Sequence, residues 1–393
     1  MRLPDYIGPC AFGIKMGVIV PGSDLLNLVL DSLQKVNEDV LLADRDVICI
    51  TESVLARAQE NYVTITEIGQ EVARKLNLAP TQKIGVLFPI FSRNRFAPIL
   101  EGIASAVPSG EVIVQLSFPK DEVGNQLVPP EVAEKLQALK GNCLTPEDLG
   151  KNYTHPITGV DYMELYRQII AEKGVRPTIV LSNDPLRIVN DCPDAVIVAD
   201  VHNREKTRQI VAPHVKRCIT LQDLFNKNAS SKAWSEWGLL GSNMSYGNKL
   251  KLAPRQSNDF VLALQEQIYQ KFGKKIEILI YGDGAYKDPS SGIYELADPC
   301  AAFGATPGIN GLLREGVKYK YLIDKHHENG KSEEEILMIV EEELSREREA
   351  NSIEFEGTTP RRMEDILASL ADLLSGSADA GTPMILVKNF LPE

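Results

Sequence analysis

The chain has 393 residues, long enough for two or three domains or for one large domain with an insertion. Its formal net charge of -12 at pH 7 argues against nucleic acid or an anionic membrane as the main partner, because phosphates would be repelled at long range. No apolar run approaches the roughly 18 residues of a membrane span, and the start lacks the layout of a signal peptide. We therefore expect no membrane partner and a cytoplasmic location.

Cysteine and histidine give no sign of a disulfide framework or a zinc site. The six cysteines include no CxxC pair, and the five histidines include no HExxH motif. We expect reduced thiols and no zinc hydrolase. The chain also has no Walker-type phosphate loop and no GxGxxG motif, so nucleotide phosphates would have to be held by a metal and by scattered basic residues.

Apolar runs that predict β-strands alternate along the chain with stretches of helical periodicity, which favours an α/β fold. Close to the start, Ser23 or Asp24 is placed to cap a helix that runs through Leu33. The other predicted helices cover residues 65–76, 258–272, 332–349 and 363–374. The predicted strands cover residues 47–50, 84–88, 112–116, 178–181, 195–199, 276–281 and 384–387.

The middle of the chain has two parts of different character. Residues 118–160 are rich in Pro, Gly, Asn and Asp, which predicts an irregular excursion from the first sheet. A second αβ unit follows at 161–224, with polar residues after its strands at 181–185 and 199–203. Each of these polar groups either lines a pocket or caps a turn, and the sequence leaves both interpretations open. The acidic stretch at 332–349 predicts an amphipathic helix with a solvated face, not a metal cluster.

Carboxylates gather just after the apolar strand at 276–281. Open α/β sheets bind their ligands at the carboxyl ends of such strands. A carboxylate there suits Mg²⁺ or Mn²⁺, so Asp283 is the predicted metal ligand, with Asp288 and Glu295 as weaker candidates. Asp298 is expected to line the same crevice.

Two glycines flank the central aspartate of this segment. Gly282 and Gly284 lack a Cβ, so the backbone amides here would be able to approach a nucleotide phosphate. The alternative is a Gly-Asp-Gly turn that does nothing more than end the strand.

Three stretches of the chain follow an order typical of one family. The first is Gly-Ser-Asp-Leu at 22–25, followed by a strand and by Thr-Glu-Ser-Val-Leu-Ala-Arg-Ala at 51–58. The second runs from Gly-Leu-Leu-Gly-Ser-Asn at 238–243 through Leu-Ala-Pro and a helix to Tyr-Gly-Asp at 281–283. The third is Gly376 followed by Thr-Pro-Met-Ile-Leu-Val at 382–387. Together they resemble the coenzyme F420-0:L-glutamate ligases, which are gamma-glutamyl ligases.

The resemblance implies a mixed-sheet fold like that of the F420-0 gamma-glutamyl ligases. Residues 1–110 and 235–393 would form the ligase-like core, and residues 111–234 would form an inserted αβ region. The resemblance also implies an amide-forming ligase in which GTP or ATP phosphorylates an acceptor carboxylate and L-glutamate displaces the phosphate. The acceptor would be coenzyme F420-0 or a related molecule such as a folate, as in a folylpolyglutamate synthase. Mg²⁺ or Mn²⁺ and a homodimer are implied as well.

Residue roles follow from the resemblance where the motifs match. It assigns Asp24 to the nucleotide site and Ser242 and Asn243 to substrate binding. Lys287 or Arg57 would offset charge in the transition state.

The chain departs from the family at several motif positions. The charged and polar residues of the family's KxVSKAE segment fall on Ser53, Ala56, Arg57 and Gln59, so one basic group remains. The family's metal-binding AGID aspartate falls near Gly247 or Asn248. These departures suggest a divergent branch.

Acidic reactants call for arginines that grip carboxylates with two hydrogen bonds. Arg93 and Arg95 follow the strand at 84–88 and would project to the same side of an extended segment, which predicts an anion site. The alternative is a positively charged loop that pairs with the acidic surface.

Two other functions compete with the ligase. A non-catalytic metabolite-binding protein on the same scaffold would explain the lost motif residues. An unrelated metal-dependent phosphatase or sugar-phosphate enzyme is supported only by carboxylates at strand ends, and the chain has no nucleophile motif for it.

Overall fold

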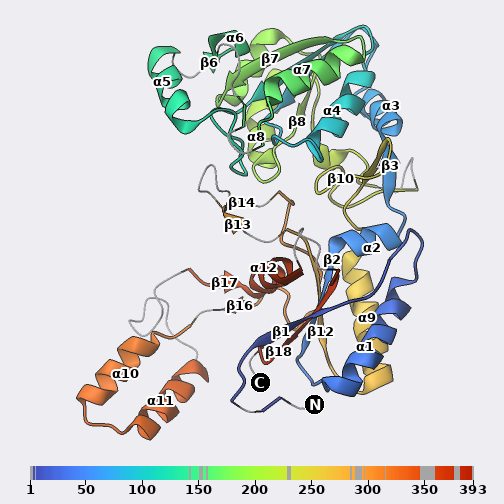
Figure 1. Cartoon of the computed structure of the whole chain (residues 1–393). Helices are drawn as coiled ribbons and strands as arrows, with labels where there is room; N and C mark the ends of the chain where they lie inside the picture. Colours follow the sequence, from blue (N-terminus) through green and yellow to red (C-terminus); the bar gives the residue numbers. More distant parts are fainter. Residues whose placement is uncertain are drawn as a thin grey trace.

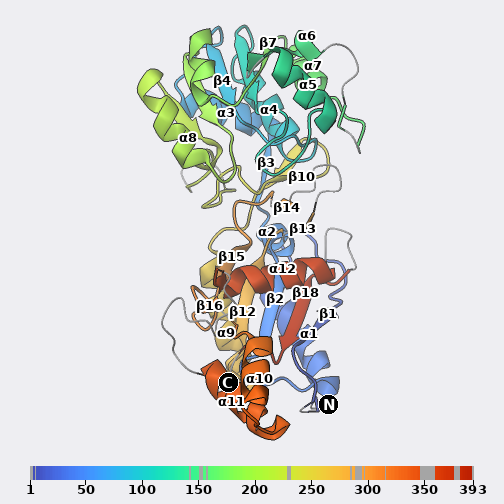
Figure 2. The same ribbon diagram turned by 90° about the vertical axis from the view of Figure 1, so that its left-hand side faces the viewer.

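A computed structural model describes most of the chain. The described residues are 3–4, 6–140, 143–149, 154–155, 158–227, 232–283, 286–287, 294–295, 297–314, 316–345, 359–375 and 381–391. Figure 1 and Figure 2 show two sheets of different type, each covered by helices, with a helical hairpin projecting beside one of them.

The first sheet is mixed and joins both ends of the chain. Its strand order is β1-β18-β2-β12-β15, and only β2 and β12 pair in parallel. Its strands are β1 (Cys10–Ile14), β2 (Val47–Thr51), β12 (Glu277–Tyr281), β15 (Ala302–Ala305) and β18 (Met384–Lys388). The predicted strands at 47–50, 276–281 and 384–387 all lie in this sheet.

Helices cover both faces of the first sheet, so alternate residues of each strand enter different cores (Figure 1). Ile48 and Ile50 of β2 pack under α1 (Leu25–Asp39) and α9 (Ser257–Phe272). Val47 and Cys49 pack under α12 (Met363–Ser375) on the other face. The near-continuous apolar strands of the sequence are the result of this double burial.

The second sheet consists mainly of parallel strands in the order β6-β7-β5-β4-β8-β9, with β6 antiparallel at one edge. Its strands are β4 (Lys83–Leu87), β5 (Glu111–Leu116), β6 (Cys143–Leu144), β7 (Arg176–Ser182), β8 (Ala195–Val198) and β9 (Cys218–Thr220). The helices around it are α3 (Ile65–Lys75), α4 (Phe96–Ser105), α5 (Pro130–Lys140), α6 (Pro146–Leu149), α7 (Tyr162–Glu172) and α8 (Arg204–Val211). Three 3₁₀ turns complete it, at Pro185–Asp191 (η1), Ala212–His214 (η2) and Leu221–Asp223 (η3).

The second sheet begins earlier in the chain than the sequence suggests. A boundary at residue 110 would separate β4 from β5, yet these two strands pair with each other. Strand β4 precedes residues 111–234, so the second sheet includes residues from outside the expected insertion. Strands β5 and β7 lie on one side of β4, whereas β8 and β9 lie on the other side, so the strand order switches between β4 and β8. Open α/β sheets bind ligands at such switch points.

A short three-stranded sheet lies between the two larger ones (Figure 2). It contains β3 (Tyr62–Thr64), β10 (Asn243–Met244) and β11 (Lys249–Lys251). The helix α2 (Glu52–Ala58) precedes β3 directly. Two further pairs of short strands are β13 (Tyr286–Lys287) with β14 (Tyr294–Glu295), and β16 (Leu313–Arg314) with β17 (Arg361–Arg362).

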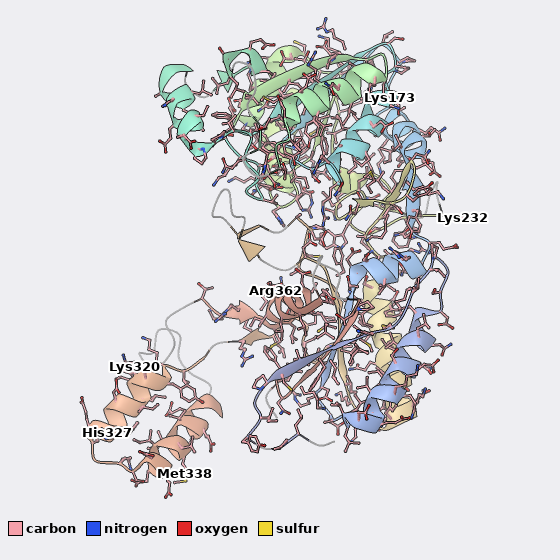
Figure 3. All side chains as sticks on the ribbon, viewed as in Figure 1. Lys173, Lys232, Lys320, His327, Met338 and Arg362 are labelled. Carbon is pink, nitrogen blue, oxygen red and sulfur yellow. The ribbon has the colours of Figure 1, made fainter. Side chains whose placement is uncertain are left out.

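The projecting hairpin consists of α10 (Tyr319–Glu328) and α11 (Glu333–Ser345), and Figure 3 labels Lys320, His327 and Met338 on it. The two helices share a small core formed by Val317, Leu322, Ile336 and Val340. Of the acidic stretch predicted as a helix at 332–349, residues 333–345 form α11 and residues 346–349 lie outside the described residues. Five glutamates of α11 are exposed and Glu343 is half-buried.

Five of the six cysteines have side chains that the structure describes, and these five are free thiols. No helix within the described residues has both the length and the apolar character needed to cross a membrane.

Candidate active site

A cavity of about 400 Å³ opens at the carboxyl ends of β2 and β12. The two strands run parallel, so the residues that follow them, Glu52 and Gly282, arrive at the same edge of the first sheet. The volume is typical of a small-molecule site. Its charged lining residues are Glu52, Arg57, Arg95, Lys251, Asp283, Asp298 and Asp372.

One arginine bridges two aspartates in the cavity wall. Arg95 Nη2 lies 2.6 Å from Asp283 Oδ2, and Arg95 Nη1 lies 2.7 Å from Asp298 Oδ1. The backbone N–H of Asp283 donates to Asp298 Oδ2 at 3.0 Å, which holds the two carboxylates next to each other. Arg95 comes from the end of the loop after β4, so the second sheet supplies the cation and the first sheet supplies the anions.

Burial and charge together shift the protonation of this cluster. The Asp298 side chain is 2% exposed and that of Asp283 is 29% exposed. Burial, followed by repulsion from Asp298, raises the pKa of Asp283 to about 7, although Arg95 opposes the change. Burial alone would lower the pKa of Arg95, but the two aspartates outweigh it and raise that pKa, so the guanidinium stays charged.

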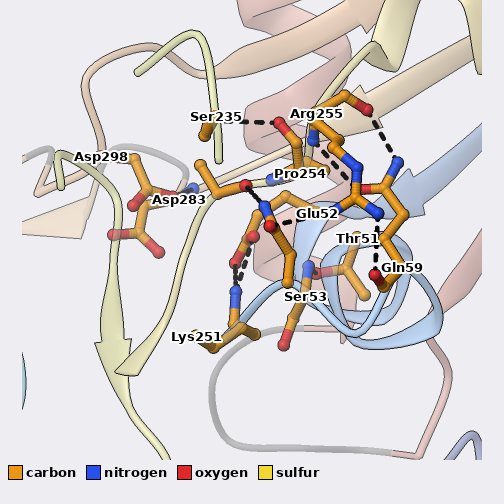
Figure 4. Close-up of polar contacts among 12 residues, drawn as sticks. Thr51, Glu52, Ser53, Gln59, Ser235, Lys251, Pro254, Arg255, Asp283 and Asp298 are labelled. Atoms are coloured by element: carbon orange, nitrogen blue, oxygen red, sulfur yellow. Dashed lines mark hydrogen bonds and ion pairs between the residues drawn. The ribbon is translucent and has the colours of Figure 1, made fainter. Parts of the chain in front are cut away.

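A second buried ion pair lies in the same wall (Figure 4). Lys251 Nζ contacts both carboxylate oxygens of Glu52, at 2.8 and 2.7 Å. Glu52 is the first residue of α2, where the helix dipole favours a negative charge, and Thr51 caps that helix. Burial raises the pKa of Glu52; Lys251 lowers it and Asp298 adds to the increase. The two ion pairs therefore influence each other electrostatically.

Gly282 leaves room for a neighbouring carboxylate. A Cβ at this position would lie 2.6 Å from Asp298 Oδ2 and 2.6 Å from a ring carbon of Phe303. Its backbone N–H donates to the carbonyl of Ala301, so it is already used within the protein. The close packing of Asp298 therefore explains why this position is a glycine, and no bound phosphate is needed for that explanation.

Comparison with known proteins decides the family. The family model described as F420-0:Gamma-glutamyl ligase matches residues 13–389. The chain belongs to the F420-0:gamma-glutamyl ligase family. No curated protein matches the sequence. Membership indicates a ligase of the gamma-glutamyl type with small-molecule substrates, and it confirms the expected α/β fold and the resemblance seen in the motifs.

The cavity brings together six of the residues predicted from the sequence. They are Arg57, Arg95, Asn243, Gly282, Asp283 and Asp298. The Arg57 side chain is exposed and donates to the carbonyl of Ile19 at 3.4 Å. Asn243 begins β10, next to β11 and its Lys251.

Three predicted residues lie elsewhere. Asp24 caps α1 through the backbone N–H of Asn27, and it is exposed and outside the cavity lining. Arg93 is exposed and does not line the cavity, so the expected pair with Arg95 is separated. Ser242 is buried beside a smaller pocket of about 20 Å³, to which Arg95 also contributes.

Four predicted residues cannot be positioned. Gly284 and Asp288 lie outside the described residues, and so do the side chains of Lys287 and Glu295, whose backbones form part of β13 and β14.

The sequence reasoning missed Glu52 and Lys251. Glu52 follows an apolar strand just as Asp283 does, so the same strand-end rule would have found it. Lys251 gives no such signal, because it lies in a three-residue strand far from Glu52 in the sequence. Asp298, expected in the crevice, does line the cavity.

The carboxylates of this cavity are suitable ligands for a divalent cation. The described residues contain no group of three or more histidine, cysteine, aspartate or glutamate side chains able to hold a metal. Mg²⁺, however, commonly binds through one or two carboxylates and completes its shell with water and substrate phosphates. Asp283 and Asp298 offer two hard oxygen ligands in a site where their mutual repulsion favours a cation.

Proposed function

We propose that this protein is a nucleotide-dependent gamma-glutamyl ligase that uses GTP or ATP. It would form an amide between L-glutamate and a carboxylate of coenzyme F420-0 or of a related acceptor such as a folate. Family membership supports the reaction type, and the departures at Ser53, Ala56 and Gln59 leave room for an altered acceptor.

The observation that supports this proposal best is the buried Asp283–Arg95–Asp298 cluster in a cavity between two sheets. Phosphoryl transfer needs little covalent help from a protein but strong electrostatic positioning. Asp283 and Asp298 would hold Mg²⁺ or Mn²⁺, which when bound would neutralise charge on the phosphate oxygens. Asp288 and Glu295 remain proposed as reserve ligands.

The proposed reaction has two steps, phosphorylation of the acceptor and formation of the amide. An oxygen of the acceptor carboxylate attacks the terminal phosphorus of the nucleotide, so a nucleoside diphosphate leaves and an acyl phosphate forms. The amine of L-glutamate then attacks the acyl carbon, forming the C–N bond and expelling inorganic phosphate. The amine loses a proton in this second step, and Glu52, a carboxylate in the cavity wall, is a suitable acceptor for it.

The remaining residue roles belong to this proposal. Arg57 and Lys287 would offset charge in the transition state, and Asn243 and Ser242 would contact substrate. Gly282, Gly284 and Asp24 stay assigned to the nucleotide, although Asp24 lies outside the cavity lining.

A panel of acceptors tests the proposal directly. The protein would be incubated with GTP or ATP, Mn²⁺, isotope-labelled L-glutamate and either F420-0, tetrahydrofolate or dihydropteroate. We expect one acceptor to gain the mass of a glutamyl residue. The absence of an adduct with every acceptor and both nucleotides, from protein that is folded, would overturn the ligase assignment.

A non-catalytic metabolite-binding protein is the second candidate. The observation that favours it is that the buried cations of the cavity, Arg95 and Lys251, are both paired with the protein's own carboxylates. This candidate predicts saturable binding of an acceptor without turnover. Detection of an adduct in the acceptor panel would exclude it.

We also propose that the protein is a homodimer and works in the cytoplasm. The dimer is suggested by the family resemblance and the location by the sequence. Light scattering coupled to size-exclusion chromatography would give the mass in solution, and a mass near 43.4 kDa would indicate a monomer instead.

A further inference from the structure

The buried cations of the cavity are engaged by carboxylates of the same cavity. Arg95 contacts both Asp283 and Asp298, and Lys251 contacts Glu52. These buried or half-buried groups thus comprise three carboxylates and two cations. In this arrangement neither cation is free to receive an anion.

The reactants of the proposed function are all anionic. A nucleotide, L-glutamate and a carboxylated acceptor each need a positive partner in a cavity that is partly shielded from water. The guanidinium fork of Arg95 matches the geometry of a carboxylate or a phosphate. Its two present partners, in turn, are oxygen ligands of the kind a hard divalent cation prefers.

We propose that Arg95 exchanges partners during the reaction: it gives up Asp283 and Asp298 when a divalent cation binds them, and then holds an anionic group of the reactants. Arg95 thereby links cation loading to reactant binding. The identity of the reactants rests on the proposed function, whereas the competition between Arg95 and a cation does not.

The surroundings of Arg95 permit such an exchange. Its backbone N–H donates to Ser92 Oγ at 3.0 Å, so the main chain is fixed at the start of α4 while the long side chain crosses to the first sheet. Arg95 and Ser242 both line a smaller pocket of about 20 Å³. Among the described residues the buried hydroxyl of Ser242 has no hydrogen-bond partner, so it could accept from an N–H group of Arg95 that leaves an aspartate.

Binding of Mn²⁺ to the full chain without nucleotide tests the competition. Electron paramagnetic resonance of free Mn²⁺ would give the affinity of the wild type and of Arg95→Gln. We expect Arg95→Gln to bind Mn²⁺ about tenfold more tightly, because its carboxylates no longer have a competing cation. Arg93→Gln removes the same charge from an exposed side chain two residues away and is expected to match the wild type.

A non-hydrolysable GTP or ATP analogue tests the second half of the exchange. In the wild type the analogue is expected to tighten Mn²⁺ binding, because freed Arg95 gains a phosphate partner. In Arg95→Gln the increase in Mn²⁺ affinity caused by the analogue should be several-fold smaller, although the affinity for Mn²⁺ without nucleotide should be higher. An arginine with a purely structural role would not change these two affinities in opposite directions.

The inference fails if Arg95→Gln binds Mn²⁺ no better than the wild type, or if the wild type binds none with or without nucleotide. Thermal melting would establish that the variant is folded. If it is not, Arg95→Lys replaces it, since one ammonium group cannot bridge two carboxylates as a guanidinium does, and it too should bind Mn²⁺ more tightly. Failure of the ligase assignment is a separate result, because it appears as a missing glutamate adduct with the wild type.

Discussion

Two carboxylates held next to each other are the main chemical feature of this protein. Asp283 and Asp298 share one guanidinium, and burial together with repulsion from Asp298 raises the pKa of Asp283. Asp283 is also the more exposed of the two, so it is the one that a reactant or a cation would meet first.

Asp283→Asn should abolish most of the activity without unfolding the protein. The amide removes one hard ligand and one negative charge, and we expect glutamate addition to fall by at least about a hundredfold. Mass detection of the adduct would measure the change. Asp31→Asn, which alters an exposed aspartate on α1, should leave the rate unaffected. Near-normal turnover in Asp283→Asn would show that this carboxylate is dispensable.

The pH dependence of stability should reveal the shifted pKa of Asp283. This pKa rises from 3.8 to about 7 on folding, so the native state binds the proton more tightly. The resulting stabilisation is complete below pH 3.8 and is lost as the pH rises through about 7. Relative to Asp283→Asn, the free energy of unfolding of the wild type should therefore fall between pH 5 and pH 8, by on the order of 1 kcal/mol.

Urea denaturation of both proteins across this pH range would measure the difference. Asp121 and Asp200 also have pKa values raised to about 7, but both proteins contain them, so their effects cancel. A difference that does not change with pH would contradict the prediction.

Among the elements, α2 and β11 depend on each other through one buried contact. Glu52 begins α2 and Lys251 ends β11, and their side chains are 13% and 9% exposed. Removing one partner of such a pair leaves a buried charge without compensation.

Lys251→Met should lower the free energy of unfolding by about 3 kcal/mol, because Glu52 is left unpaired. The double variant Glu52→Gln with Lys251→Met should recover most of the loss, since no buried charge remains. Urea denaturation of the wild type, the two single variants and the double variant would give the free energies of unfolding for this double-mutant cycle. Additive losses in the double variant would mean that the pair contributes through packing alone.

The sequence was sufficient for elements whose local pattern is strong. The apolar runs of β2, β4, β5, β7, β8, β12 and β18 predicted strands that the structure contains. The strand-end rule led from β12 to Asp283 because both lie in one short segment. Nothing local indicated Lys251, since β11 is a strand only through its pairing with β3 and β10. The assignment of β4 to the second sheet likewise depends on tertiary pairing with β5 and β8.

Across the whole molecule, the ion cluster connects parts of the chain that are far apart in sequence. The Arg95–Asp298 contact spans 203 residues, and the Arg95–Asp283 contact spans 188. Spacing in a single sequence carries no information on such pairs, which explains why Arg95 was expected to pair with Arg93 around an external anion. The α10–α11 hairpin is the opposite case, with a core made almost entirely from its own residues.

The hairpin should open independently of the rest of the molecule. Its four buried apolar side chains form a core too small to match the stability of the central sheets. We expect amide protons of α10 and α11 to exchange with deuterium at much lower free energy than those of β2 and β12. Hydrogen exchange followed by mass spectrometry would test this. Equal protection of hairpin and sheets would mean that an undetected partner surface stabilises the hairpin.

The position of β18 has a consequence for the order of assembly during synthesis. β18 is the last strand in the sequence, yet it lies between β1 and β2 in the first sheet. A growing chain on the ribosome can therefore complete the second sheet, whose strands fall within residues 83–220, long before the first. Among the described strands β1 pairs only with β18, so until residues 384–388 emerge β1 has no partner there and the edge of β2 that β18 covers stays unpaired. The nascent protein would most need a chaperone during this interval.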